Sequence, residues 1–443
     1  MKKDRAKKIL SILLLSTLVL STMFSVGCTK TPSSSQPQSQ APDPTQISAT
    51  LNYFEPHYLV DSNVKAIDAT IAAFNKVYPN IKIEIQYVPA ADRTAKFIAA
   101  MAANQGPDVV CLGNIADYYQ FVQSGFLKEM DSTFIAKPDE YWAKFPKNFV
   151  DALTIKGKKY GIPYYSGPHA MIYNKAAYAA AGITEFPKTW SEFKIVAKKL
   201  TRDTNGDGKI DQYGLTFPSL DVQAPRIFTM FAWSNGGEII DSNGNPTINS
   251  PKCVEALTYL TSLVKEGLVP PGIGETSLAV NDEYFGTGAA ATKIEGNWDM
   301  AQIPAKYPTM AGNIDAYPMI ANDGKTPVSM NILGSYAITT QTKNAEASFA
   351  FLNYMMTDEC QQLFLNKAGM GPVTNSAIAA NKNAPIYGGF IQSLATSKIR
   401  PMNQSSTEVD DIIREALQSA YLGKATPQQA LDAANEKLKA VLK

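Results

Sequence analysis

The sequence is poor in the side chains on which most enzyme and metal chemistry depends. Only two of its 443 residues are histidines, His57 and His169. So few imidazoles nearly exclude a histidine–zinc centre, or a catalytic triad with histidine as its base. The formal net charge is only +1, and no basic face is evident, so nucleic acid is not an expected partner.

Cysteine is also scarce, with four residues in the whole chain. Apart from Cys28, the cysteines show no spacing typical of a metal site, and their odd number argues against a disulfide framework. Cys111 stands in the apolar run DVVCLG, where a thiol behaves as a small buried hydrophobe. The other two are Cys253 and Cys360.

The N-terminus has the order of a secretory signal. A lysine- and arginine-rich start precedes the apolar run 9–20, which is too short for a comfortable membrane span. The run leads into FSVGC, which resembles the lipobox of bacterial lipoproteins, where the cysteine becomes the lipidated N-terminus. We expect a signal peptide at 1–27, lipidation of Cys28, and a membrane-anchored protein facing the extracellular or periplasmic side. The alternative is an uncleaved anchor helix.

The chain after the signal divides into a polar segment and a folded part. Residues 28–47 are almost entirely Pro, Ser, Gln and Thr, so they are expected to form a disordered linker. Strand patterns at 49–54, 81–88 and 108–112 then alternate with helix patterns, which favours a parallel sheet with right-handed crossovers. The predicted fold class is therefore α/β, and 443 residues require two lobes or domains.

Later helices carry start signals of their own. Thr189 with Glu192, and Thr426 with Gln429, form the pattern of a capping box.

Ligands of open parallel α/β sheets bind beyond the carboxyl ends of the strands. This rule selects Glu55 and Asn114, which follow the first and third strands, and Asn297 and Trp298, which follow the strand pattern TKIEG. Rings and amides suit a neutral polyhydroxylated ligand, because sugar C–H faces stack on rings and hydroxyls pair with amides. Core packing is the alternative for each aromatic residue. Three further aromatic candidates are Tyr164, Tyr165 and Trp233.

The stretch RDTNGDGKIDQYG, at 202–214, has the spacing of an EF-hand-type calcium loop. Position twelve, normally a bidentate glutamate, is Gly214, so a complete site needs an oxygen from elsewhere or water. The alternative is a polar turn that stabilises its own backbone. We expect a structural Ca²⁺ here rather than a sensor, because the paired helices of a sensor are missing. The expected ligands are Asp203, Asn205, Asp207, the Lys209 carbonyl and Asp211.

Several longer motifs resemble the bacterial extracellular solute-binding proteins of ABC importers, in their carbohydrate-binding branch. They include FNKVYPNIKIEIQYV, GPDVV, SGFLKEMD, EGNWDMA, LGSYAIT, AFLNYMMTDECQQ and, most specific, MIYNKAAYAAAGI followed by PKTWSEF. The resemblance implies two α/β lobes, each a mainly parallel sheet flanked by helices, that close over one ligand by a hinge. It implies a non-catalytic monomer that delivers a sugar, expected to be an oligosaccharide, to a membrane permease.

The resemblance also assigns residues and boundaries. Trp298 takes the position of the family's sugar-stacking tryptophan, Tyr336 falls near a crossover between lobes, and Arg400 lies in the part that faces the cleft. The expected N-lobe comprises 48–165 and 336–374, and the expected C-lobe 166–335 and 375–443.

Two other functions stay open on the sequence alone. Glu295 and Asp299 flank Trp298, and a carboxyl pair is the machinery of a glycoside hydrolase. A binding protein for another small solute, such as a peptide or a polyamine, would use the same fold.

Overall fold

The computed structural model of the chain describes residues 44–55, 61–89, 92–401 and 407–442. The predicted signal peptide at 1–27, Cys28 and most of the predicted linker therefore lie outside the described residues, as does His57. Within the described ranges, no helix is long and apolar enough to cross a lipid bilayer. Lipidation of Cys28 accordingly stays a prediction.

Strands and helices alternate in the first part of the described chain, as the sequence predicts. β1 pairs in parallel with both β2 and β3, and the helices α1 and α2 make the crossovers that parallel neighbours require. The elements up to the first interlobe strand are β1 (Ala49–Glu55), α1 (Asp61–Val77), β2 (Ile81–Tyr87), α2 (Arg93–Ala102), β3 (Val109–Leu112), α3 (Ile115–Gln123), α4 (Pro138–Trp142), α5 (Lys147–Ala152), β4 (Thr154–Ile155) and β5 (Lys158–Lys159).

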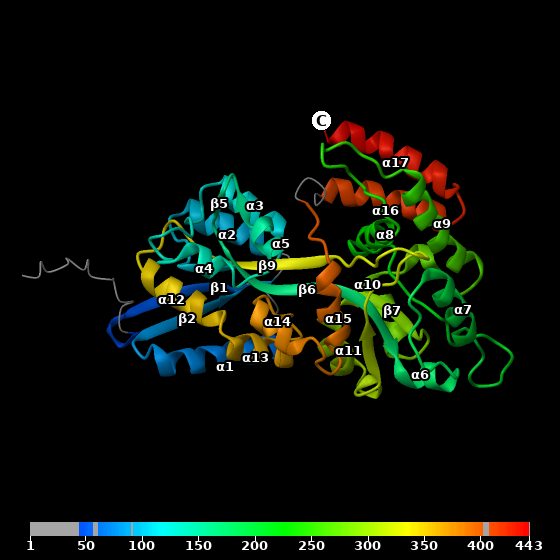
Figure 1. Cartoon of the computed structure of the whole chain (residues 1–443), viewed down its shortest axis with the longest axis horizontal. Coiled ribbons are helices and arrows are strands. Elements are labelled where there is room, and N and C mark those ends of the chain that lie inside the picture. Colours follow the sequence, from blue (N-terminus) through cyan, green and yellow to red (C-terminus); the bar gives the residue numbers. More distant parts are fainter. Residues whose placement is uncertain (1–43, 56–60, 90–91, 402–406, 443) are drawn as a thin grey trace, which may run out of the picture. The chain divides into compact units, whose positions relative to one another are not determined.

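Two long strands connect the lobes. β6 (Ile162–Asn174) contains the aromatic candidates Tyr164 and Tyr165, and β9 (Asn331–Ile338) lies between β3 and β6, antiparallel to both. Figure 1 shows β6 and β9 running side by side between the helices around β1 and those around β7. The strand order is β2-β1-β3-β9-β6-β7, with β8 also paired to β6. The last two strands are β7 (Thr292–Gly296) and β8 (Ile314–Tyr317).

The strand pairing beyond the crossing differs from the expected mainly parallel sheet. Both β7 and β8 are antiparallel to β6. The segment 213–217, whose residues YGLTF have the composition of a strand, makes only isolated parallel bridges at Tyr213 and Thr216. Between them, Leu215 donates its N–H to the carbonyl of Leu268 instead of to a neighbouring strand, which interrupts a regular ladder.

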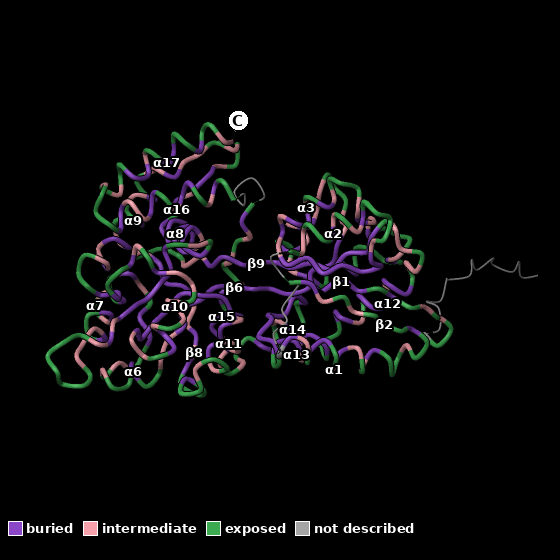
Figure 2. Tube along the Cα trace, turned by 180° about the vertical axis from the view of Figure 1, so that it is seen from behind, coloured by how far each residue is buried: buried purple, intermediate pink, exposed green. Residues whose placement is uncertain are grey.

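Three clusters of buried hydrophobic side chains form the interior. One cluster is built around β1, β3, α1 and α12, and we call the elements that surround it the N-lobe. The two others are built around α8, α9, α16 and α17, and around α11 and α15, and we call these elements the C-lobe. Figure 2 shows buried backbone along β6 and β9, and exposed backbone on the outward sides of α1 and α17.

The remaining helices follow this division. N-lobe helices after β9 are α12 (Ala345–Met355) and α13 (Asp358–Ala368). C-lobe helices are α6 (Lys175–Ala180), α7 (Trp190–Leu200), α8 (Gln223–Ser234), α9 (Pro251–Lys265), α10 (Leu278–Gly286), α11 (Asp299–Lys306), α15 (Gly388–Ser393), α16 (Thr407–Tyr421) and α17 (Pro427–Val441).

One helix lies just beyond the predicted lobe boundary at 374. In α14 (Asn375–Asn381), Asn375 donates its N–H to Lys144, and Ser376 bonds to Asp358. Both partners belong to the N-lobe. The exact boundaries of the lobes stay predictions.

The helix starts that the sequence predicts are confirmed. Both capping boxes form, at Thr189 for α7 and at Thr426 for α17. Among the described residues, Cys111, Cys253 and Cys360 are buried and none of them is in a disulfide.

Candidate ligand-binding cleft

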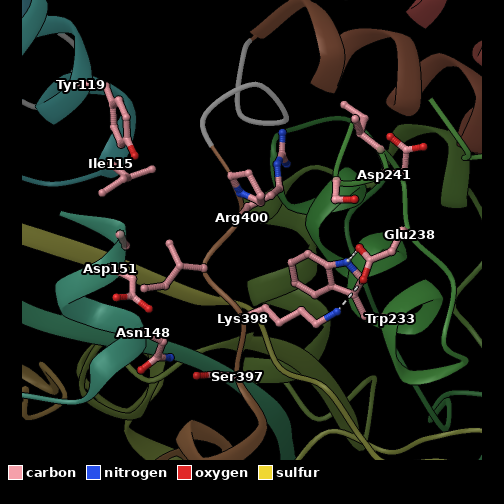
Figure 3. A pocket seen from close by; sticks show the side chains of 15 residues that line it. Ile115, Tyr119, Asn148, Asp151, Trp233, Glu238, Asp241, Ser397, Lys398 and Arg400 are labelled. Carbon is pink, nitrogen blue, oxygen red and sulfur yellow. Dashed lines mark hydrogen bonds and ion pairs between the residues drawn. The ribbon is translucent and has the colours of Figure 1, made fainter. Parts of the chain in front are cut away.

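A cavity of about 830 Å³ lies between the lobes, within the range of small-molecule sites. In Figure 3, Ile115, Tyr119 and Asp151 approach it from α3 and α5, and Trp233 faces them from the end of α8. The segment that carries Lys398 and Arg400 lies between the two sides. We call this space the large cavity. Its further lining residues are Asn148, Ala152, Glu238, Ile240, Asp241, Ser242, Ser397, Ile399 and Pro401.

Trp233, selected from the sequence as an aromatic candidate, is fixed on the C-lobe side of this cavity. Its indole N–H donates to Glu238 at 2.8 Å, and the Lys398 ammonium lies 5.3 Å from the ring centroid. Lys398 also pairs with Glu238 at 2.6 Å. Trp233 is buried, so Glu238 and Lys398 present the polar groups at this point while the indole supports them.

A second cavity of about 360 Å³ shares Ile115, Ile399 and Arg400 with the first, and we call it the small cavity. Arg400 is buried and pairs with Asp410 at 2.5 Å. Burial lowers the pKa of Arg400, and Asp410 opposes that effect. The lining residues are Arg93, Asn114, Ile115, Ala116, Asp117, Val222, Arg226, Met330, Asn331, Ile332, Leu333, Ile399, Arg400, Thr407 and Asp410.

Asn114 is placed on the small cavity by its role as a helix cap. Its side-chain oxygen accepts the N–H of Asp117 and begins α3, while its amide N–H donates to the Asp117 carboxylate at 3.0 Å. Asp117 in turn accepts from Arg93 at 2.7 Å. The strand-end rule therefore identified a residue that lines a cavity. The charged side chains around Asn114 could not be identified from the sequence.

Trp298 lies directly beyond β7, as predicted, and is half-buried. Its ring meets His169 edge-on at 5.4 Å and packs over Gly296, where an added Cβ would come within 2.2 Å of the indole. Asn297 is buried and donates to the Ser166 carbonyl at 3.1 Å. Neither residue lines the large or the small cavity. Their roles in binding stay predictions.

Three candidates lie in the core of the N-lobe. Tyr336 is 0% exposed, because its ring packs into the hydrophobic cluster of the N-lobe from the central strand β9, which pairs with β3 and β6. Its ring contacts Tyr164 with centroids 4.1 Å apart, and the Tyr53 hydroxyl, 3.3 Å from that of Tyr336, also donates to Glu55. With Glu55 1% and Tyr164 3% exposed, the structure gives these side chains an interior position instead of the expected cleft surface.

Tyr165 is also buried, but it reaches the base of the cleft. Its hydroxyl donates to the Gly113 carbonyl at 3.0 Å, directly before Asn114. Its ring occupies the space left by Gly334, where a Cβ would lie 2.3 Å from a ring carbon. Tyr165 therefore supports the residue at the start of α3 rather than offering a free ring face.

The predicted calcium loop is exposed, and its acidic oxygens accept from the loop itself. Asp203 accepts the N–H groups of Asn205, Gly206 and Gly208, which lowers its pKa. Asn205 accepts from Asp207, Asp207 from Lys209, and Asp211 from Thr204. Among the residues that the structure describes, no group of three or more His, Cys, Asp or Glu side chains is arranged to hold a metal. These bonds match the polar-turn alternative, and calcium stays a prediction.

Sequence reasoning missed several residues that line the cavities. Tyr119 lies on the outer part of α3, and Lys398 lies in an irregular segment, so neither follows a strand end. Arg226 is in the first turn of α8, and Asn331 opens β9. The only sequence signal for Arg226 is the helix start around Gln-Ala-Pro-Arg. Nothing local indicates that Asn331 faces a cavity.

Comparison with known proteins places this architecture in a family. Residues 61–362 match the family model of the bacterial extracellular solute-binding proteins. Because the match covers more than half of the chain, the protein belongs to the bacterial extracellular solute-binding protein family, whose members are exported.

Individual relatives are similar over most of their length. The galactooligosaccharide-binding protein of Bacillus subtilis is 26% identical over 392 residues, which cover 85% of this chain and 86% of that protein. The maltotriose-binding protein of Pyrococcus abyssi is 23% identical over 78% of this chain and 72% of its own. The GacH receptor of Streptomyces glaucescens, solved unliganded and with acarbose, has a TM-score of 0.75 at 21% identity, covering 90% of this chain and 99% of that one. This last likeness shows the two-lobed fold.

Proposed function

We propose that the protein is the substrate-binding component of an ABC importer that captures an oligosaccharide between its lobes and delivers it to a membrane permease. The observation that carries the proposal is the large cavity, lined from both lobes by aromatic, amide and charged side chains. This mixture suits a ligand with many hydroxyls and apolar ring faces. Relatives named for galactooligosaccharide and maltotriose binding support the same ligand class.

The proposal includes the predicted anchorage and solution state. Lipidation at Cys28 would hold a monomer on the outer face of the cell membrane, with residues 29–47 as the tether. The lipobox-like FSVGC and the exported family support this part.

We also infer that this chain does not hydrolyse its ligand. Glu295 and Asp299, the carboxyl pair beside Trp298, are 1% and 4% exposed. Asp299 is ion-paired with Lys293, and Glu295 accepts from Gln223. A hydrolase needs two carboxyls that reach the scissile bond, whereas these two are held by interior partners. Release of shorter products from a bound oligosaccharide would overturn this inference.

One test of sugar binding uses Trp298, the stacking residue that the family resemblance implies, which lines neither cavity. We expect Trp298→Ala to weaken binding of an oligosaccharide at least tenfold, about 1.4 kcal/mol, because the stacking surface is lost. Titration calorimetry with galacto- and malto-oligosaccharides measures the affinity, after a thermal-shift screen has found the tightest of them. Trp298→Phe should keep part of the affinity.

Two further variants separate the alternatives. Tyr284→Ala removes a half-buried C-lobe ring that is neither the predicted stacking residue nor part of a cavity lining, and should leave the affinity unchanged. Tyr119→Ala removes a ring from the large cavity and should weaken binding. Unchanged affinity in Trp298→Ala would remove Trp298 from the site. A screen that finds only non-sugar solutes would replace the carbohydrate with the alternative ligand class.

A further inference from the structure

The charges that line the small cavity do not balance. Three arginines and two aspartates belong to its lining. Two of the arginines have partners, because Arg93 pairs with Asp117 at 2.7 Å and Arg400 with Asp410 at 2.5 Å. Arg226 remains. The cavity therefore carries one surplus positive charge.

Arg226 has no carboxylate partner in the part of the chain that the structure describes. Among the residues described, no ion pair within 4 Å involves it, and its Nη1 makes a long bond of 3.3 Å to the Gln223 side-chain oxygen. A guanidinium has five N–H donors and stays charged at any physiological pH. Arg226 is half-buried, so much of its donor capacity faces the cavity that it lines.

The carboxyls within range of Arg226 have other partners. Burial raises the pKa of Glu295 and of Asp410, and in both cases Arg226 is among the cations that lower it again, so the guanidinium is near them. Yet Glu295 accepts from the Gln223 amide, and Asp410 is paired with Arg400. The positive charge of Arg226 thus lowers the pKa of both acids, but neither acid forms an ion pair with Arg226.

A second group on the cavity has unmet hydrogen bonds. Asn331, at the start of β9, is 1% exposed, and both its side-chain nitrogen and its side-chain oxygen are buried without a partner among the described residues. Burying an amide unpaired costs free energy, so such groups usually meet a ligand or water. Asn331 lines the same cavity as Arg226 and offers one donor group and one acceptor.

We propose that the small cavity receives the carboxylate of an acidic sugar, a uronate unit of the captured oligosaccharide, with Arg226 binding the carboxylate and Asn331 a neighbouring hydroxyl. The inference rests on the proposed function, since it names the chemical class of sugar for that cleft. Guanidinium and carboxylate match in geometry and form two parallel charge-assisted bonds. A neutral sugar would leave Arg226 desolvated without a counter-charge, and a site built for a charged group rejects the analogue that lacks it.

The test compares an acid with its own ester. Titration calorimetry and thermal shift on the full chain use digalacturonate and diglucuronate, their methyl esters, and inorganic sulfate. The esters keep the shape and remove the charge. The wild type is expected to bind an acid at least tenfold more tightly than its ester. Arg226→Gln should bring this ratio close to one, and Arg226→Lys should keep part of it.

Two variants complete the design. Arg414→Gln removes an arginine of α16 that pairs with Asp411 and lines neither cavity, so the ratio should not change. Asn331→Ala should weaken acid and ester alike, because it addresses a hydroxyl. The melting temperature of each variant without ligand establishes that it is folded.

Each other outcome overturns a defined part of the inference. Equal or tighter binding of the esters would show a neutral-sugar site, and the proposed function would stand without the acidic ligand. An acid preference that survives in Arg226→Gln would remove Arg226 from the site. Sulfate that binds as tightly as the acids would indicate a free anion instead of a sugar. If no saccharide of either kind bound, including neutral oligosaccharides, the proposed function would fail as well.

Discussion

Glu55 in the N-lobe and Glu295 in the C-lobe are strand glutamates that are each 1% exposed, yet their surroundings differ. Glu55 accepts from the Tyr53 hydroxyl, which lies 3.3 Å from the hydroxyl of Tyr336. Burial raises the pKa of both tyrosines, so they stay neutral hydrogen-bonding groups. One partner of the interior carboxyl of the N-lobe is therefore a neutral hydroxyl.

The C-lobe surrounds its interior carboxyl with charged groups. Lys293 is 0% exposed and pairs with Asp282 at 2.5 Å and with Asp299. Burial lowers the pKa of Lys293, but Asp299 and Asp282 outweigh it and hold the ammonium charged. Burial raises the pKa of both Glu295 and Asp299. A buried ion network is sensitive to loss of one member, because the remaining charges lose their compensation.

The largest predicted effect is that of Lys293→Met. Removing the ammonium leaves the carboxyls of Asp299 and Asp282 without their cation, and we expect a loss of about 3–5 kcal/mol in the free energy of unfolding. Denaturant titration measures it. The exposed pair of Lys82 with Glu84 provides the control, since Lys82→Met should cost less than about 1 kcal/mol. A loss below about 1 kcal/mol in Lys293→Met would show that the ion network does not stabilise the C-lobe.

The next effect depends on pH and concerns His169, between Glu295 and Trp298. Burial, and then the charge of Arg226, lowers the pKa of His169 to about 4. The unfolded chain takes up this proton near pH 6.5. Between these values the unfolded state holds more protons, so stability is present above pH 6.5 and is lost as the pH falls towards 4. We expect the wild type to lose up to about 3 kcal/mol relative to His169→Gln over this window.

Unfolding titrations at several pH values measure that difference. NMR provides an independent check, because the His169 ring should remain neutral at pH 5 in the native protein. A ring that titrates near pH 6.5 would contradict the prediction.

A smaller effect is expected for Tyr53→Phe in the N-lobe. The change removes the hydroxyl that donates to Glu55, and a hydrogen bond to a charged group contributes about 2 kcal/mol. Tyr354→Phe, with a half-buried ring in the same lobe, should stay within about 0.5 kcal/mol of the wild type. If Tyr53→Phe cost as much as Lys293→Met, the contrast between the two lobes would disappear.

The smallest effect concerns the exposed loop at 203–211. If the loop binds calcium, free calcium at ten times the dissociation constant stabilises the fold by about 1.4 kcal/mol, and a chelator removes this. Sugar affinity should be nearly unchanged, because the loop lines neither cavity. Thermal melts with calcium and with chelator test it, with Asp203→Ala as the variant that should not respond. If the wild type had the same melting temperature with calcium and with chelator, the loop would be a polar turn that binds no calcium.

Parts of the cleft could be predicted because they depend on local rules. Asn114 caps α3 directly after β3 and lines the small cavity, so a strand end and a helix start placed it. Trp298 follows β7 as expected, and its role in binding stays a prediction. The inward position of Tyr336 could not be predicted. It depends on the packing of its ring into the N-lobe cluster from β9, which pairs with strands that are distant from it in the sequence.

The sequence by itself determined the α/β class, the helix caps and the family, because each rests on residues that are neighbours or on motifs read directly from the chain. Only the tertiary structure decided which polar groups meet. Arg226 comes from α8 and Asn331 from β9, and no spacing in the sequence relates them. Whether a side chain is buried, paired or left facing a cavity depends on strand register and packing between distant segments, and these form only when the chain has folded.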